Sequence, residues 1–393
     1  MSNTIFNIRG RTDTGLLRDN NEDNFTICAD LSKTEEAWFI PEAKSLILGD
    51  LGCVMSVADG MGGNNAGEVA SDIAIKAIEK KFSDREQLTK IKDSLKEIEK
   101  FMVEALVYAD AKINEQIKKD RSTEGMGTTI VLLWAVDGMA YYCWCGDSRA
   151  YLYNRKEEPR LRRLSKDHSY VQQLVDEGKL TEDEAFDHPE SNIITKCLGS
   201  GVEAPSPDFD FHPLHRGDIY LLCTDGLCGV CKDNAITALL DTYDGDLSQL
   251  SLDLIELAKK EGGPDNITVM LLAILDADEP SSRNPYSQTL HPSEGDNHDN
   301  HFNGNLRKKL TIGLASVALV VLGILLWQAP DPDPDDKSGI QDTISKQDTI
   351  SKESRDTTLN PVLNLKSNHK QSFNKDSFDL NVKKFDEEAK RAI

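Results

Sequence analysis

The sequence has too few basic residues to balance its acidic ones. Its 45 Lys and Arg residues face 67 Asp and Glu residues, which leaves a formal net charge of −22. Because phosphate contacts need an excess of Lys and Arg, this deficit argues against a nucleic-acid-binding chain. The same acidity suits a protein that binds divalent cations. With 39% hydrophobic residues, the chain can still build a substantial core.

A secretory signal and a disulfide framework are also missing. The N-terminal residues contain no apolar stretch of the kind that a signal peptide needs. The eight cysteines lie mostly inside apolar runs, as Cys143 and Cys145 do, which predicts buried, reduced thiols. Cys228 and Cys231 have the C-x-x-C spacing of a zinc or redox pair. No second pair matches them, so we interpret these cysteines as structural.

One long apolar segment divides the chain. Residues 310–328 carry no charged side chain, and a helix of this length would span roughly 28 Å. Trp327 lies at the far edge, where aromatic rings favour a membrane interface, and Arg307, Lys308 and Lys309 precede the near edge. The positive-inside rule therefore predicts a single-pass anchor with the N-terminal part in the cytoplasm and the tail outside. A buried core helix is the alternative.

Polar segments flank this predicted span. Residues 276–309 are rich in Asn, Ser and Pro and predict a flexible linker. Its His291, His298 and His301 could suggest a metal site, but without a rigid frame we interpret them as solvated. Residues 329–393 predict a low-complexity extracytoplasmic tail, in which the unit QDTISK occurs twice in direct succession. The sequence does not predict what this tail does.

Residues 1–275 alternate apolar runs with helical stripes and predict the globular domain. Runs of β-branched and aromatic residues predict strands over 54–58, 128–136, 139–145, 149–153, 219–224 and 267–275. Apolar residues at helical spacing predict helices over 66–82 and 95–113. The dipeptide Asp137-Gly138 indicates a two-residue hairpin. Hairpins combined with long helices predict an α+β fold with antiparallel sheets.

Acidic residues recur where the predicted strands stop. Four turns beside apolar runs carry them, and these turns contain Asp59, Asp225, Asp265 and the Glu22-Asp23 pair. Mg²⁺ and Mn²⁺ prefer oxygen ligands on rigid elements, and two such ions can activate a water for attack on phosphorus. A single Asp-Gly pair is more often an ordinary turn. Four acidic turns together favour a metal centre.

Seven segments resemble the protein phosphatase 2C family, the metal-dependent serine/threonine phosphatases, in its bacterial form. In chain order they are TDTGLLRDNNEDNF (12–25), VADGMGGNNAGEVAS (57–71), GMGTTIVLLW (125–134), CGDSRAYLY (145–153), DHSYVQQLVDEGKLTEDEAFDHPESNIITKCLG (167–199), GDIYLLCTDGL (217–227) and GGPDNITVMLLAI (262–274). This set is highly specific and covers nearly all of residues 5–275. The resemblance implies a sandwich of two antiparallel β-sheets flanked by helices, in four α-β-β-α layers, with a two-metal centre at one end.

The resemblance also implies ligands for the metal ions. Asp59 resembles the carboxylate that bridges two ions, while Asp225 and Asp265 resemble the remaining ligands of the first ion. The carbonyl of Gly60 resembles a ligand of the second ion. Asp147 resembles a ligand of a third, weaker ion; the alternative is an ordinary acid in a hairpin turn.

Three further residues resemble parts of the family's reaction centre. Glu22 and Asp23 resemble acids that act largely through water molecules on the ions. Arg18 resembles the residue that binds the substrate phosphate, and its planar guanidinium suits two phosphoryl oxygens. The implied reaction is attack on phosphorus by a water that bridges two Mn²⁺ or Mg²⁺ ions, without a phospho-enzyme.

The implied substrates are phosphoserine and phosphothreonine on proteins, including a Ser/Thr kinase. With the predicted span, the resemblance implies an enzyme on the cytoplasmic face of a bacterial inner membrane that opposes such kinases. A related possibility is a phosphatase acting on an anti-sigma-factor antagonist, which the lack of a sensor domain disfavours. An alternative of another class is a catalytically silent, phosphatase-like scaffold that binds phosphoproteins, although such a protein would be expected to lack the ligand acids.

The sequence also departs from the family pattern. Residues 30–52 lengthen the loop before the first metal-binding strand, compared with compact bacterial relatives. Ser191 replaces an arginine that is frequent in the family, within a segment (167–199) that resembles a mobile flap over the site. His168 and His188 lie in the same segment, and we interpret them as hydrogen-bonded or surface residues.

Overall fold

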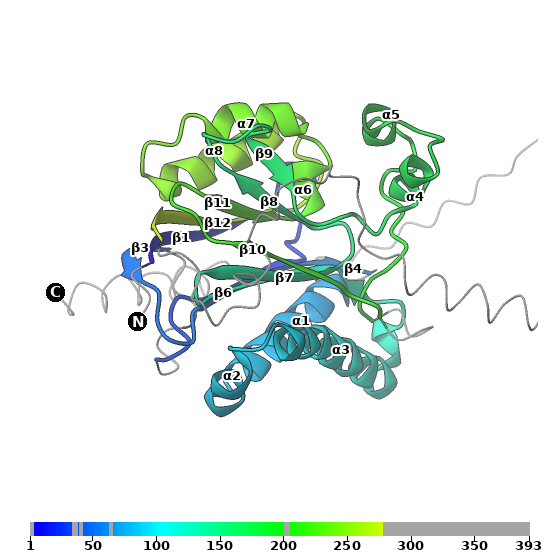
Figure 1. The fold of residues 1–393 in the computed structure, drawn as a ribbon. Helices are drawn as coiled ribbons and strands as arrows, with labels where there is room; N and C mark the ends of the chain where they lie inside the picture. The colour runs from blue at the N-terminus through cyan, green and yellow to red at the C-terminus, as the bar shows by residue number, and fades with distance from the viewer. Residues whose placement is uncertain (1–3, 34–37, 39–41, 63–65, 200–204, 278–393) are drawn as a thin grey trace, which may run out of the picture. The chain divides into compact units, whose positions relative to one another are not determined.

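The computed structural model describes residues 4–33, 38, 42–62, 66–199 and 205–277 (Figure 1). The predicted span over 310–328 and the tail over 329–393 lie outside these residues, as does all but the start of the predicted linker. Within the described ranges, no helix is both long enough and apolar enough to cross a membrane.

The first of two sheets contains both the N-terminal strand and the last described strand. Its order is β3 (Glu42–Ile47), β1 (Ile5–Asp13), β12 (Ile267–Asp276), β11 (Ile219–Cys223), β8 (Arg149–Tyr153) and β9 (Leu161–Arg163). All neighbours are antiparallel. Every residue of β11 is buried, because one face of the sheet packs on helices and the other on the second sheet. This double burial explains the uninterrupted apolar runs of the inner strands.

The second sheet lies against the first (Figure 1). Its order is β10 (Asp208–Pro213), β7 (Met139–Cys145), β6 (Ile130–Val136), β4 (Cys53–Met61) and β2 (Asp23–Cys28), and the short β5 (Gly127–Thr128) pairs with the end of β4. The predicted hairpin joins β6 to β7. Asp137 and Gly138 both have positive φ, at 48° and 75°, as a type I′ turn requires.

Helices cover both outer faces of the sandwich (Figure 1). Beneath the second sheet lie α1 (Ala66–Phe82), α2 (Arg85–Ile91) and α3 (Leu95–Lys119), the last followed by a 3-10 turn over Arg121–Thr123. On the first sheet lie α6 (Asp225–Cys228), α7 (Asp233–Leu240) and α8 (Leu247–Lys260). Two short helices, α4 (Tyr170–Asp176) and α5 (Glu182–Phe186), occupy the connection between β9 and β10. The α+β class, the antiparallel sheets and the helical layers are therefore confirmed.

Two sequence-based expectations need correction. The loop expected over residues 30–52 is wrong in part, because residues 42–47 form β3, which pairs with β1 at the sheet edge. Four further strands, β1, β2, β9 and β10, were not predicted. Their side chains mix polar with apolar residues, as the partly exposed β10 does, so they lack the apolar signal of inner strands.

Candidate active site

Six acidic side chains approach one another at one end of the sandwich. We call this set the acidic cluster: Glu22, Asp23, Asp59, Asp147, Asp225 and Asp265, whose carboxylates interact electrostatically as a connected group. Each acid lies within two residues of the end of a strand of one sheet or the other. Packing the sheets face to face therefore gathers residues that are up to 243 positions apart in the sequence (265 − 22).

Asp59 lies near the end of β4, directly opposite Asp23 of β2. Its backbone is fixed on both sides: the Asp59 N–H donates to Thr129 Oγ1 at 3.2 Å, and Thr128 Oγ1 donates to the Asp59 carbonyl at 2.7 Å. Burial, together with the charges of Asp225, Asp23 and Asp147, raises the pKa of the Asp59 carboxyl well above its usual range. Thr128 and Thr129 thus hold the backbone of a predicted metal ligand.

Two buried threonine hydroxyls hold the Asp23 carboxylate. Its Oδ2 accepts hydrogen bonds from Thr224 Oγ1 at 2.8 Å and from Thr268 Oγ1 at 2.6 Å. Burial nevertheless raises the pKa of Asp23 to about 7, against the opposing effect of these two hydroxyls. Neither hydroxyl partner was predicted from the sequence.

Three carboxylates of the acidic cluster lack a full set of partners. Among the described residues, Oδ1 of Asp23, of Asp147 and of Asp225 is buried without a hydrogen-bond donor. A buried, unpaired carboxylate oxygen is costly, so the protein would not gather several of them for stability alone. Divalent cations with a preference for oxygen provide the missing partners. The residues present therefore fit a centre for Mg²⁺ or Mn²⁺.

Close backbone packing holds Gly60 beside Glu22. The Gly60 N–H donates to the Glu22 carbonyl at 3.2 Å, and Ser71 Oγ of α1 donates to the same carbonyl at 2.7 Å. A Cβ atom on Gly60 would lie only 2.2 Å from the Gly67 carbonyl oxygen, so no larger residue fits there without movement. The glycine lets the end of β4 lie against the start of α1.

Arg18 lies at the rim of the acidic cluster. Its Nη2 is 2.7 Å from Asp265 Oδ2, and about half of its side chain is exposed. Burial favours the neutral form, but Asp265, together with the charges of Glu22 and Asp59, outweighs it and raises the pKa of Arg18. A permanently charged guanidinium beside the acids can therefore reach an anion in solvent.

Asn266 organises the loop that carries Arg18 and Glu22. Its Oδ1 accepts from the Glu22 N–H at 2.7 Å, and its Nδ2 donates to the carbonyls of Thr14 and Asn20 at 2.9 and 2.8 Å. No role was predicted for Asn266 from the sequence, although it directly follows Asp265 in the family-like segment 262–274.

A cavity of about 370 Å³ adjoins the acidic cluster. Its walls come from α4 to α7 and the neighbouring turns, and they include Asp147, Arg149, Gln172, Asp225, Lys232 and Asp265. Arg149 forms a buried ion pair with Asp167, with N–O distances of 2.6 to 3.0 Å. This pair was not predicted from the sequence either, because no local pattern links a strand residue to a loop residue 18 positions later. Three acids of the cluster, Asp147, Asp225 and Asp265, thus face this cavity.

The structure also agrees with the predictions for cysteine and histidine. All eight cysteines are free thiols, and all except the partly exposed Cys197 are buried. His168 is buried and accepts a hydrogen bond from the Gly146 N–H at 3.0 Å, while its Nε2 lies 3.3 Å from Asp208. His188 accepts from the Glu190 N–H at 3.1 Å.

Comparisons with known proteins find the same family that the sequence motifs resemble. The family model described as "Protein phosphatase 2C" matches residues 44–266. The serine/threonine protein phosphatase PstP of Mycobacterium tuberculosis is 33% identical over 279 residues, which are 70% of this chain and 46% of that protein. The protein phosphatase PhpP of Streptococcus pneumoniae is 36% identical over 222 residues, which are 56% of this chain and 86% of that protein. The chain thus spans about half the length of the mycobacterial relative.

Solved structures share the fold. The catalytic domain of serine/threonine protein phosphatase PstP, solved in complex with two manganese ions, is 30% identical to this chain. The match covers 70% of this chain and all of that one, with a TM-score of 0.54.

Proposed function

The chain belongs to the protein phosphatase 2C family, and we propose that it hydrolyses phosphoserine and phosphothreonine on proteins with Mn²⁺ or Mg²⁺ as its cofactor. The observation that carries this proposal is the acidic cluster, with its unpartnered buried oxygens beside Arg18. The solved PstP domain with two manganese ions supports the choice of metal.

The acidic cluster would hold the ions through its oxygen atoms. Asp59 would bridge two of the ions. Asp225 and Asp265 would be the remaining protein ligands of the first ion, and the Gly60 carbonyl would bind the second. Glu22 and Asp23 would act through water, and Asp147 would take part in a third, weaker ion. When bound, the ions supply a water activated for attack on phosphorus and neutralise charge on the phosphoryl oxygens.

Residues of the chain prepare the substrate for this attack. Arg18 would bind two phosphoryl oxygens through its guanidinium, which can turn from Asp265 because it is half exposed. Thr128 and Thr129 keep the backbone of Asp59 in place, so that its carboxylate does not have to reorganise during the reaction. Arg149, fixed by Asp167, forms a rigid part of the cavity wall beside Asp147.

We further propose that the enzyme acts at a membrane. In this proposal residues 1–275 form the catalytic domain, 276–309 a linker, 310–328 a single-pass anchor and 329–393 an extracytoplasmic tail. The catalytic domain would face the bacterial cytoplasm and oppose Ser/Thr kinases there. Deleting residues 310–328 should move the protein from the membrane fraction to the soluble fraction, and unchanged membrane association would contradict this part of the proposal.

The activity is tested by following hydrolysis of a phosphothreonine peptide by the purified chain while Mn²⁺ is titrated. We expect turnover that saturates with Mn²⁺, stops on chelation and is lost in Asp59→Asn. Asp241→Asn is the matched control, because Asp241 binds Tyr153 and Arg160 away from the acidic cluster. A folded chain without turnover at any Mn²⁺ concentration would instead favour the phosphoprotein-binding scaffold.

A further inference from the structure

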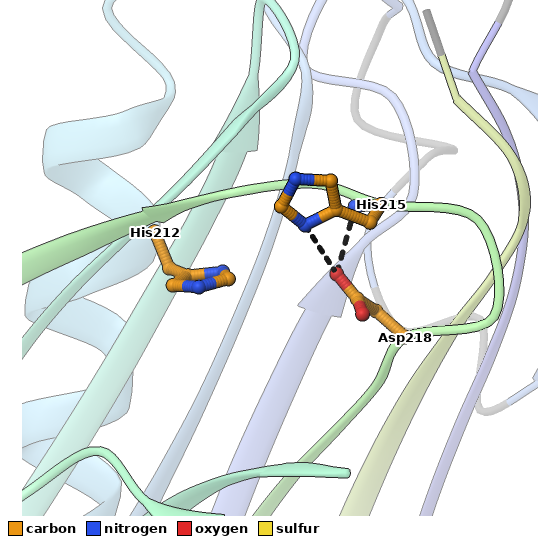
Figure 2. A group of neighbouring side chains, drawn as sticks. All are labelled: His212, His215 and Asp218. Carbon is orange, nitrogen blue, oxygen red and sulfur yellow. Dashed lines mark hydrogen bonds and ion pairs between the residues drawn. The ribbon is translucent and has the colours of Figure 1, made fainter. Parts of the chain in front are cut away.

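A second group of metal-binding side chains lies at the other end of β11 from Asp225. We call it the histidine cluster: His212 of β10, His215 of the connection that follows, and Asp218 directly before β11. One ligand atom from each residue lies within 4.8 Å of the other two. Figure 2 shows His215 and Asp218 joined by dashed lines, with the His212 ring beside them. No residue of the acidic cluster takes part.

The Asp218 carboxylate is fully buried and held by two donors. Its Oδ1 accepts from Asn154 Nδ2 at 2.7 Å, and its Oδ2 accepts from the His215 N–H at 2.7 Å. A carboxylate oxygen has two lone pairs, so Oδ2 keeps the capacity to bind an ion. Hydrogen bonds of this kind orient carboxylate ligands in established metal sites. The geometry thus supplies an anchored ligand rather than a mobile surface acid.

The two histidines are placed to complete a site around this carboxylate. His215 Nδ1 lies 3.6 Å from Asp218 Oδ2, close to the separation of about 3.4 Å between two ligands of one tetrahedral Zn²⁺ ion. His212 Nδ1 lies 3.5 Å from the hydroxyl of buried Tyr220, and the ring centroids of His212 and His215 are 5.6 Å apart. Modest side-chain rotation would bring all three ligand atoms onto one ion.

The donor atoms of the histidine cluster, two imidazoles and one carboxylate, select the kind of ion. Mg²⁺ prefers oxygen ligands alone, whereas imidazole combined with carboxylate suits Zn²⁺ and similar transition metals.

We propose that His212, His215 and Asp218 form a binding site for a divalent transition-metal ion of the zinc type, separate from the catalytic centre. Water would fill the remaining coordination positions, because His215 is half exposed. The ion would join the end of β10 to the start of β11. This proposal does not depend on phosphatase activity.

The test measures Zn²⁺ bound to the full chain by equilibrium dialysis, with Mg²⁺ in excess. We expect His212→Ala and His215→Ala each to bind one zinc ion fewer per chain than the wild type, or to bind it at least about tenfold more weakly. His188→Ala, which removes a histidine outside the cluster, should bind as the wild type does. Zinc bound by the acidic cluster or by the linker histidines is common to all of these proteins and cancels in the comparison.

Thermal unfolding provides a second readout on the same proteins. Zn²⁺ should raise the unfolding temperature of the wild type and of His188→Ala more than that of His212→Ala or His215→Ala. Because His215 is half exposed, its replacement should leave a folded protein even if His212→Ala does not fold. If folded His215→Ala binds zinc with the stoichiometry and affinity of the wild type, the proposed site is wrong.

Discussion

Asp225 and Asp218 lie just beyond the two ends of the same buried strand, β11, yet their surroundings differ. Both oxygens of Asp218 accept a hydrogen bond from the protein, one from Asn154 and one from His215. Asp225 lies among other carboxylates, and its buried Oδ1 has no donor among the described residues. The protein therefore supplies hydrogen-bond donors to both carboxylate oxygens of Asp218. It leaves a carboxylate oxygen of Asp225 for a cation to bind.

This difference separates an acid whose charge the fold itself stabilises from acids whose burial costs stability. Burial raises the pKa of Asp59, Asp147 and Asp225, with further increases from the neighbouring carboxylates. Like charges in a low-dielectric site oppose ionisation. Without cations the acidic cluster is therefore destabilising, and bound cations would relieve it, whereas Asp218 needs no ion to be stable.

The largest expected effect is on catalysis, from Asp59→Asn. The amide keeps the size of the side chain but removes the charge that would bridge two ions. Since losing even an outer-shell partner of a metal site costs about 10- to 100-fold, we expect kcat/KM to fall by more than about 100-fold. Steady-state hydrolysis of a phosphothreonine peptide measures it. If Asp59→Asn has a kcat/KM near that of the Asp241→Asn control, Asp59 is not a ligand of the metal centre.

A smaller loss is expected from Arg18→Lys. Lysine keeps the positive charge but loses the planar pair of donors. A hydrogen bond to a charged group contributes about 1.5–3 kcal/mol, so kcat/KM should fall roughly tenfold to a hundredfold. Arg160→Lys is the matched control, because it alters an arginine paired with Asp241. It should have the kcat/KM of the wild type. Equal kinetics of the two variants would show that Arg18 does not bind the phosphate.

Replacing Asp218, at the other end of β11, should lower the stability of the fold. In Asp218→Asn one amide N–H must face a donor, either Asn154 Nδ2 or the His215 N–H. A buried donor without an acceptor costs about 1–3 kcal/mol. Urea unfolding should therefore show a loss of that size in the free energy of unfolding at neutral pH. A variant as stable as the wild type would mean that the hydrogen bonds of Asp218 contribute little.

The inner strands were predictable from sequence because their burial on both faces leaves long apolar runs. The runs over 139–145 and 149–153 coincide with β7 and β8, and 219–224 overlaps β11. Edge strands such as β3 and β10 were missed, because one-sided burial leaves a mixed pattern. Helices over 66–82 and 95–113 were expected, and α3 continues to Lys119, beyond the last apolar residue of the predicted stripe.

The acidic residues of the site were also identified from sequence, since acids after apolar strands and the family resemblance both indicated them. The residues that hydrogen-bond to these acids were not identified from the sequence. Thr268 binds Asp23 across 245 positions, and Asn266 binds Glu22 across 244. Contacts over such separations depend on how the two sheets pack, which no local pattern contains. The roles of the individual acids in metal binding stay predictions.

The sign of a pH effect follows from the raised pKa of Asp59. In the unfolded chain this group loses its proton near 3.8, but in the folded, metal-free protein it keeps the proton to a higher pH. Between these values the folded state binds more protons, so its stability falls as pH rises. The amide introduced by Asp59→Asn cannot titrate, so the variant escapes this loss.

The most direct measurement compares the unfolding free energies of metal-free wild type and metal-free Asp59→Asn from pH 4 to pH 8. We predict that the variant becomes progressively more stable relative to the wild type as pH rises. Saturating Mn²⁺ should reverse the order by stabilising the wild type more than the variant. A stability difference that does not change with pH, together with equal stabilisation of both proteins by Mn²⁺, would contradict the assignment of the acidic cluster as a cation centre.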